Sequence, residues 1–299
     1  MKKIKMSFTI VAFFSLFPIY VRAQTNSSYV RNIETIGDLK LAIDSSSYQI
    51  VMQNMDSWFP KIVSTTNWQN RISPSYMLHY YIDVNDDDDI LFDSLAEQSE
   101  TIFSQLNEFF EMEAITKQEI LAQQTRLLCF IIKTQTNATF GFMVNPHTLF
   151  FYLDTKQTPD FMEKLRHEYA HWVWGRTYGE APSLFWEGLA TYAEKMSNPG
   201  SNTSSLLDTK IDLENIPSLH KIAFNDQFWR HKGMYTVGSL LIHFLVEKWG
   251  WEKLKKLFLI SHFDDPKISE HFQQIYQQSL ETIDFEWRQF IKTELMEKD

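Results

Sequence analysis

The pattern of apolar and polar residues divides the chain into a part with strands and a part that is helical. Four runs rich in β-branched and aromatic residues predict strands: 75–84, 126–134, 138–144 and 148–154. Residues 93–113 repeat apolar side chains at helical spacing, and segment 24–72 does so less regularly. From about Pro159 the helical pattern continues to the end of the chain. A sheet followed by helices predicts an α+β fold.

The first residues have the layout of a secretory signal peptide. In "MKKIKMSFTIVAFFSLFPIYVRAQ", lysines precede an apolar stretch, and Val21 and Ala23 then place small residues three and one before Gln24. An uncleaved membrane anchor is the alternative, but the stretch is shorter than the ~20 residues that span a bilayer, and it contains Pro18. We therefore expect residues 1–23 to be a cleaved signal peptide and the protein to be exported, as a periplasmic or secreted protein.

Composition and charge limit what the exported protein can bind. The chain has a single cysteine, Cys129, so an intramolecular disulfide is impossible, and a metal would be held by histidines and carboxylates. Removal of residues 1–23 takes away four positive charges and no negative one, which changes the net charge from −10 to −14. The sequence then has no cluster of Lys and Arg for nucleic acid and no further apolar run for stable membrane insertion.

The motif "HEYAH" (167–171) carries the candidate chemistry. His167 and His171 are four residues apart, so on a helix they point only ~40° apart and one turn along the same face. Both imidazoles can therefore reach one ion, while Glu168 lies beside the first and can reach a metal-bound water without being a ligand. A catalytic zinc site needs a third protein ligand and an open fourth position. We expect that ligand on the next helix, in "APSLFWEGLATYAEKM".

HExxH followed by EGxAxYxE resembles the gluzincin metallopeptidases, the group that includes thermolysin and aminopeptidase N, and is most similar to the peptidase-MA-like family. The resemblance extends over about residues 125–295. It implies that Glu187 is the third zinc ligand, that each chain binds one Zn²⁺, and that Thr191 or Glu194 holds a histidine ligand in orientation. It also implies a thermolysin-like zincin, with a small mixed sheet and the HExxH helix in residues 73–180 and a mostly helical half in residues 181–299.

Two further segments resemble aminopeptidase N. "MYTVGSLLIHFLVEKWG" is similar to its YxxG segment, which implies that the hydroxyl of Tyr235 stabilises the oxyanion; His231 is the rival donor. "GFMVN" is similar to its substrate-binding edge strand, which implies that Gly141, Met143 and Asn145 contact the substrate backbone. An ordinary edge strand is the alternative. Val144 stands where aminopeptidases have the glutamate that binds a free amine, which argues against an aminopeptidase.

These features together predict a secreted zinc metallopeptidase. A zinc-activated water would attack a peptide bond of a peptide or protein substrate, with Glu168 as the general base. Two alternatives remain at this point. The chain could be a catalytically silent, peptidase-like surface or binding protein, or a zinc hydrolase of a non-peptide amide or ester.

Overall fold

The computed structural model describes a substantial part of the chain. The described residues are 69–72, 78–82, 89–112, 128–134, 140–145, 148–154, 158–198, 200–201, 206, 215–223, 233–263 and 265–296. The expected signal peptide and most of the expected N-terminal helical segment lie outside them. The last four residues of that segment, Gln69–Ile72, form a strand where the sequence predicts a helix.

Five strands form one sheet in the described part of the chain. They are β1 (Gln69–Ile72), β2 (Leu78–Ile82), β3 (Leu128–Thr134), β4 (Phe140–Asn145) and β5 (Thr148–Asp154). Their order in the sheet is β1-β2-β3-β5-β4, so β4 lies at an edge. β2, β3 and β5 are parallel, whereas β1 and β4 are antiparallel to their neighbours.

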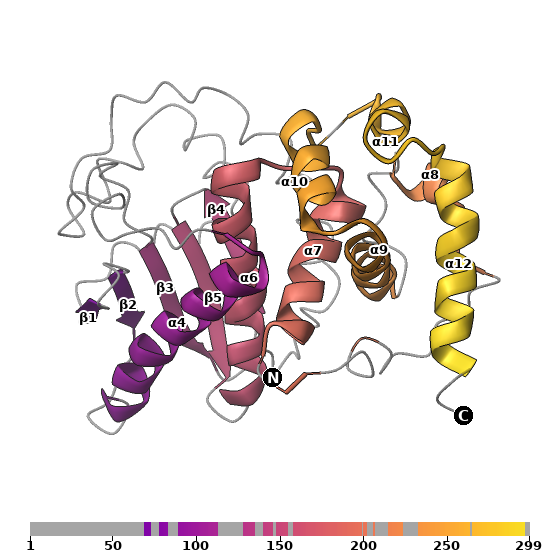
Figure 1. Cartoon of the computed structure of the whole chain (residues 1–299). Coiled ribbons are helices and arrows are strands. Elements are labelled where there is room, and N and C mark those ends of the chain that lie inside the picture. Colours follow the sequence, from indigo (N-terminus) through magenta and orange to yellow (C-terminus); the bar gives the residue numbers. More distant parts are fainter. Residues whose placement is uncertain are drawn as a thin grey trace, which may run out of the picture.

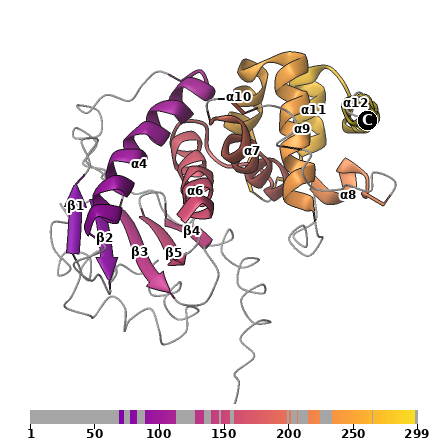
Figure 2. The same cartoon turned by 90° about the horizontal axis from the view of Figure 1, so that it is seen from below.

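Two long helices lie over one face of this sheet, as Figure 2 shows from below. They are α4 (Asp89–Phe109) and α6 (Thr158–Tyr178). α6 has Pro159 in its first turn, where a missing N–H costs no hydrogen bond. It ends before Gly179, which has a positive φ of 77° and donates its N–H to the carbonyl of Gly175. The middle of α6 is buried on all sides, because α4, the sheet, α7 and α10 surround it.

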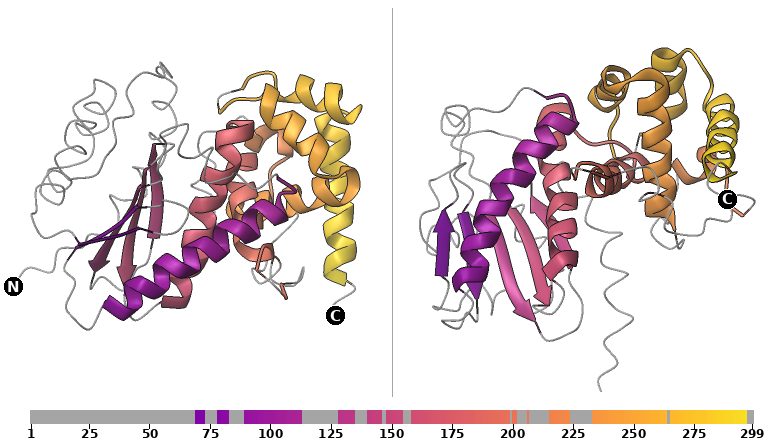
Figure 3. Two further views of the ribbon diagram at one scale, coloured as in Figure 1. Left: turned by 60° about the vertical axis from the view of Figure 1, so that its left-hand side comes forward. Right: turned by 60° about the horizontal axis from the view of Figure 1, so that its bottom comes forward.

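The remaining helices extend away from the sheet (Figure 1). They are α7 (Ser183–Met196), α8 (Leu219–Ala223), α9 (Met234–Trp249), α10 (Trp251–Ile260), α11 (Ile268–Tyr276) and α12 (Leu280–Met296). α7 packs against α6 on one side and along α9 on the other, so it joins the two groups of helices (Figure 3). Aromatic rings fill the core between α4, α6 and α10, where Phe110 and Trp174 are fully buried.

The expected fold class, a thermolysin-like α+β zincin with a small mixed sheet, is corrected by the structure. Apart from Leu149 of β5, every residue whose side chain is described lies in a helix or in the chain next to one. Helices therefore form the described core and the candidate site, and the part of the protein whose side chains are described is helical rather than α+β. The prediction gave too much weight to the aromatic and β-branched runs. Such runs indicate a strand locally, but do not say which elements build the core.

The expected domain boundaries at residues 73 and 181 stay predictions. α6 and α7 lie on either side of the second boundary, and they pack directly against each other. Among the described residues, none of the helices is long and apolar enough to span a membrane.

Candidate metal centre

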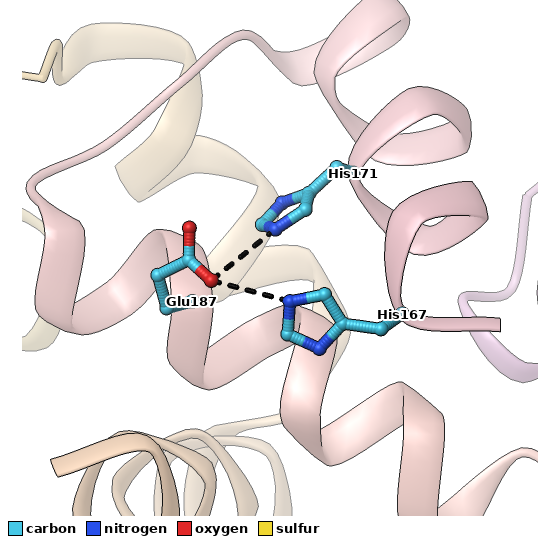
Figure 4. A group of neighbouring side chains, drawn as sticks. All are labelled: His167, His171 and Glu187. Carbon is cyan, nitrogen blue, oxygen red and sulfur yellow. Dashed lines mark hydrogen bonds and ion pairs between the residues drawn. The ribbon is translucent and has the colours of Figure 1, made fainter. Parts of the chain in front are cut away.

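Two histidines of α6 and a glutamate of α7 converge on one point (Figure 4). The Nε2 atoms of His167 and His171 lie 3.2 and 3.5 Å from Oε2 of Glu187. One ligand atom from each residue falls within 4.8 Å of the others, so a single ion could contact all three. Two imidazole nitrogens and one carboxylate oxygen are a donor set that catalytic zinc takes, with a fourth position left for water or substrate.

Local geometry explains why these three side chains meet. His167 and His171 lie one turn apart on α6, so they share a face. Only residues 179–182 link α6 to α7, and Pro182 begins the turn into α7, where its carbonyl accepts the N–H of Phe185. The short link keeps α7 beside α6, and Glu187 in the second turn of α7 then faces the histidines.

Glu194 contacts the ring nitrogen of His167 that does not face Glu187. Its Oε2 lies 2.9 Å from Nδ1 of His167, and its Oε1 accepts a hydrogen bond of 3.1 Å from Lys164. A carboxylate on Nδ1 fixes the ring orientation and leaves Nε2 free for a metal. The family resemblance implies that Thr191 or Glu194 holds a histidine ligand in orientation. Only Glu194 makes the contact, because the buried Thr191 hydroxyl has no hydrogen-bond partner among the described residues.

The pKa values of His167, Glu187 and Glu194 are shifted, because His167 contacts both carboxylates. Burial alone would lower the pKa of His167, but hydrogen bonds to Glu187 and Glu194 raise it to about 10. Burial would raise the pKa of Glu187, but the charge of His171 and the hydrogen bond from His167 lower it to about 2. The pKa of Glu194 is also lowered to about 2, because contacts with His167 and Lys164 outweigh its burial. A proton on His167 thus occupies the position where a cation would bind.

Glu168 lies beside the ligand candidates but does not belong to their cluster. Its side chain is buried, and this burial raises its pKa above the ordinary 4.5. The positive charges of His167 and His171 offset part of that effect, while Glu187 adds to it. A carboxylate with a raised pKa next to a metal-bound water is suited to accept and return a proton.

Tyr235 comes to the site from α9. Its ring centre lies 6.2 Å from that of His167, and the residue is 41% exposed. Desolvation and the nearby carboxylates Glu187 and Glu168 raise its pKa well above the usual range for tyrosine. Its hydroxyl therefore stays protonated and can donate a hydrogen bond. The rival donor, His231, lies outside the described residues.

The predicted substrate-binding residues lie on β4. Gly141, Met143 and Asn145 belong to this strand, whose outer side is the edge of the sheet. Its pairing with β5 is regular to Met143 and shifts between Met143 and Asn145, at Val144. The structure describes the backbone of this strand but not these side chains. Their contact with a substrate therefore stays a prediction.

Two residues of the site were not predicted in their roles. Lys164 is one turn before His167, and this spacing is the only signal in the sequence for its contact with Glu194. Trp186 is buried, and its ring stacks on that of His171, with 4.5 Å between ring centres. Its position directly before Glu187 could have indicated this proximity.

No family model matches the sequence of this chain, and no curated protein matches it either. What the centre does is therefore inferred from its own residues. Three converging ligand atoms, a buried carboxylate beside them and a protonated phenol nearby can together bind a cation, move a proton and stabilise an anion.

Proposed function

We propose that this protein is an exported zinc metallopeptidase of the gluzincin type. The observation that carries the proposal is the convergence of His167, His171 and Glu187, whose ligand atoms lie within 4.8 Å of one another. Their order, HExxH followed by the glutamate of EG, supports zinc hydrolysis because it also places a non-ligand glutamate in the first motif.

Each residue of the centre has a defined task in this proposal. A bound Zn²⁺ would supply an acidified water and a Lewis acid for the scissile carbonyl. Glu168 accepts the proton of the attacking water and delivers it to the leaving amine. Tyr235 donates a hydrogen bond to the carbonyl oxygen as this atom gains negative charge. Glu194 keeps the ring of His167 in place throughout.

The proposed substrates are peptides or proteins that are cut without recognition of a free N-terminus. This part of the proposal rests on Val144 in "GFMVN", since an aminopeptidase would have an acidic side chain there to bind the amine. The proposed site of action is outside the cytoplasm, because residues 1–23 have the layout of a signal peptide.

Digestion of a peptide library by the purified protein tests the function, with cleavage positions determined by mass spectrometry. We expect cleavage within peptides whose N-termini are acetylated, loss of cleavage after chelation, and recovery when Zn²⁺ is added. The matched variant is Glu168→Gln, which keeps the shape of the side chain but cannot accept the proton. It should retain zinc and lose activity by about 10²–10⁴-fold.

Two results would contradict the proposal. A protein that binds zinc but cuts no peptide would be a binding protein or a hydrolase of other amides or esters. Full activity of Glu168→Gln would remove the general base from the mechanism. If acetylation abolished all cleavage, only the proposed mode of substrate recognition would be wrong.

A further inference from the structure

The two histidines of the centre are held in different ways. Nδ1 of His167 contacts the carboxylate of Glu194 at 2.9 Å. His171 is only 4% exposed, so water does not readily reach its ring. Its Nδ1 atom is buried and has no hydrogen-bond partner among the described residues. Histidines that bind metals almost always use the second nitrogen to fix the ring. Within the described part of the chain, the contacts that orient His171 are therefore packing contacts.

Trp186 lies against the face of His171. The two ring centres are 4.5 Å apart and the ring planes are inclined by only 27°, so the rings are stacked. Trp186 is itself 7% exposed, and its ring also lies near that of Phe258 of α10, with 6.4 Å between ring centres. The ring of His167 lies nearly perpendicular to that of His171, with 4.9 Å between ring centres and 83° between the planes. The imidazole of His171 is thus in contact with the rings of both Trp186 and His167.

Gly175 provides the space for the indole. It lies one turn after His171 on α6, and a Cβ added to it would be 2.6 Å from Cη2 of Trp186. Real Cβ atoms essentially never come so close to another atom. The indole therefore covers a surface of α6 that contains both the imidazole of His171 and the bare backbone of Gly175. Any other residue at position 175 would push Trp186 away from this surface.

We propose that Trp186 is the positioning residue of His171, which it holds by aromatic stacking where the first histidine is held by Glu194. This inference rests on the proposed metal centre and adds to it a residue outside the set of ligand candidates. Stacking restricts the tilt and rotation of an imidazole but, unlike a carboxylate, brings no negative charge. The centre thus combines a charged support for His167 with an uncharged support for His171.

Metal affinity of the full-length protein tests this role independently of catalysis. Zn²⁺ binding would be measured by competition with a chromophoric chelator, and the visible absorption of bound Co²⁺ would report the coordination geometry. In Trp186→Leu we expect zinc affinity to fall by about tenfold or more, within the range for residues that support metal ligands. The Co²⁺ bands should change in the same variant. Trp186→Phe retains an aromatic face and should keep most of the affinity.

The matched control is Trp174→Leu, which removes another buried indole, from α6. The ring of Trp174 packs against those of Phe110, Trp251 and Phe258, and none of its ring contacts involves a ligand candidate. We expect Trp174→Leu to lower the melting temperature but to leave zinc affinity and the Co²⁺ spectrum unchanged. Gly175→Ala is the complementary variant. It leaves Trp186 in the sequence, but its added methyl group should push the indole away from His171. It should weaken zinc binding even if Trp186→Leu fails to fold.

The outcomes separate this inference from the proposed function. If the unmodified protein binds no zinc, the metal centre itself is wrong, and the role of Trp186 with it. If the unmodified protein binds zinc and both Trp186→Leu and Gly175→Ala match it in affinity and Co²⁺ spectrum, only the role of Trp186 is wrong. Equal losses of affinity in Trp174→Leu and Trp186→Leu would also overturn it, because the effect would then come from general destabilisation.

Discussion

Gly188 of α7 and Gly238 of α9 meet backbone to backbone. A Cβ on Gly188 would lie 2.5 Å from the carbonyl carbon of Gly238, and a Cβ on Gly238 would lie 2.6 Å from the carbonyl oxygen of Leu184. The two helices can approach this closely only because both residues lack side chains. Glu187 directly precedes the first glycine, and Tyr235 lies one turn before the second. The crossing point therefore brings the proposed oxyanion donor to the ligand candidates.

Substitution of Gly238 by alanine should loosen this crossing. Alanine favours a helix over glycine by about 0.5–1 kcal/mol, so a change in helix propensity alone would stabilise α9. The steric overlap should outweigh this gain and lower the free energy of unfolding by about 1–3 kcal/mol. Urea denaturation measures the effect. Because Tyr235 moves with α9, turnover should fall while zinc, bound by α6 and α7, is retained.

Glu247→Ala is the control for this variant, because the side chain of Glu247 is exposed near the other end of α9. Its free energy of unfolding should change by no more than about 0.5 kcal/mol. If the Gly238→Ala protein were as stable and as active as the original, the close approach of α7 and α9 would contribute neither to the free energy of unfolding nor to turnover.

Zinc affinity should distinguish the proposed ligand Glu187 from the proposed supporting residue Glu194. Glu187→Gln replaces a carboxylate ligand by an amide, and its loss of affinity should exceed the 10–100-fold or so that is typical of supporting residues. Glu194→Gln should fall within that range, because it weakens only the contact to Nδ1 of His167. Chelator competition on both proteins measures the difference. The opposite order of the two losses would make Glu194 the ligand.

Zinc binding should release a proton from His167. In the metal-free protein the pKa of His167 is raised to about 10, whereas an ordinary histidine titrates near 6.5. At pH 8 His167 is therefore still protonated, and it must lose this proton before Nε2 can bind a metal. Affinity should rise with pH, since a higher pH removes the competing proton. Calorimetry in buffers of different ionisation enthalpy should detect at least one proton released per zinc at pH 8.

Glu194→Gln provides the control for this measurement, because Glu194 helps to raise the pKa of His167. With this contact weakened, fewer protons should be released at pH 8. An unmodified protein that takes up zinc at pH 8 without releasing protons would contradict the strong pairing of His167 with the two carboxylates.

The parts of the site that depend on one helix could be predicted from the sequence. The spacing of His167 and His171 fixes their common face, because helix geometry alone determines it. Glu187 lies on another helix, and its role was named through a resemblance to a family. The contacts of Lys164 and Trp186 depend on how closely α6 and α7 approach, and no periodicity encodes that distance.

The fold class was predicted wrongly for a related reason. The apolar runs near Cys129 and Leu149 indicate strands, but a run of this kind does not say how much of the core its strands will form. In the described part of the chain the core is built where helices cross, and the crossing at Gly188 and Gly238 depends on what these residues lack. The pattern of apolar and polar side chains does not indicate where two glycines allow helices to approach closely.

Removal of the Tyr235 hydroxyl should slow turnover without disturbing the metal. Tyr235→Phe keeps the ring that lies 6.2 Å from His167, so the fold and the zinc content should be unchanged. The substitution removes the donor that the raised pKa of Tyr235 keeps protonated, and kcat should fall by about 10²–10³-fold, with a smaller change in KM. Steady-state kinetics on one cleaved peptide, with zinc content measured in parallel, would show this. His231→Ala is the matched variant for the rival donor. If Tyr235→Phe keeps its kcat and His231→Ala loses it, the oxyanion is stabilised by His231, and Tyr235 only packs beside the first zinc ligand.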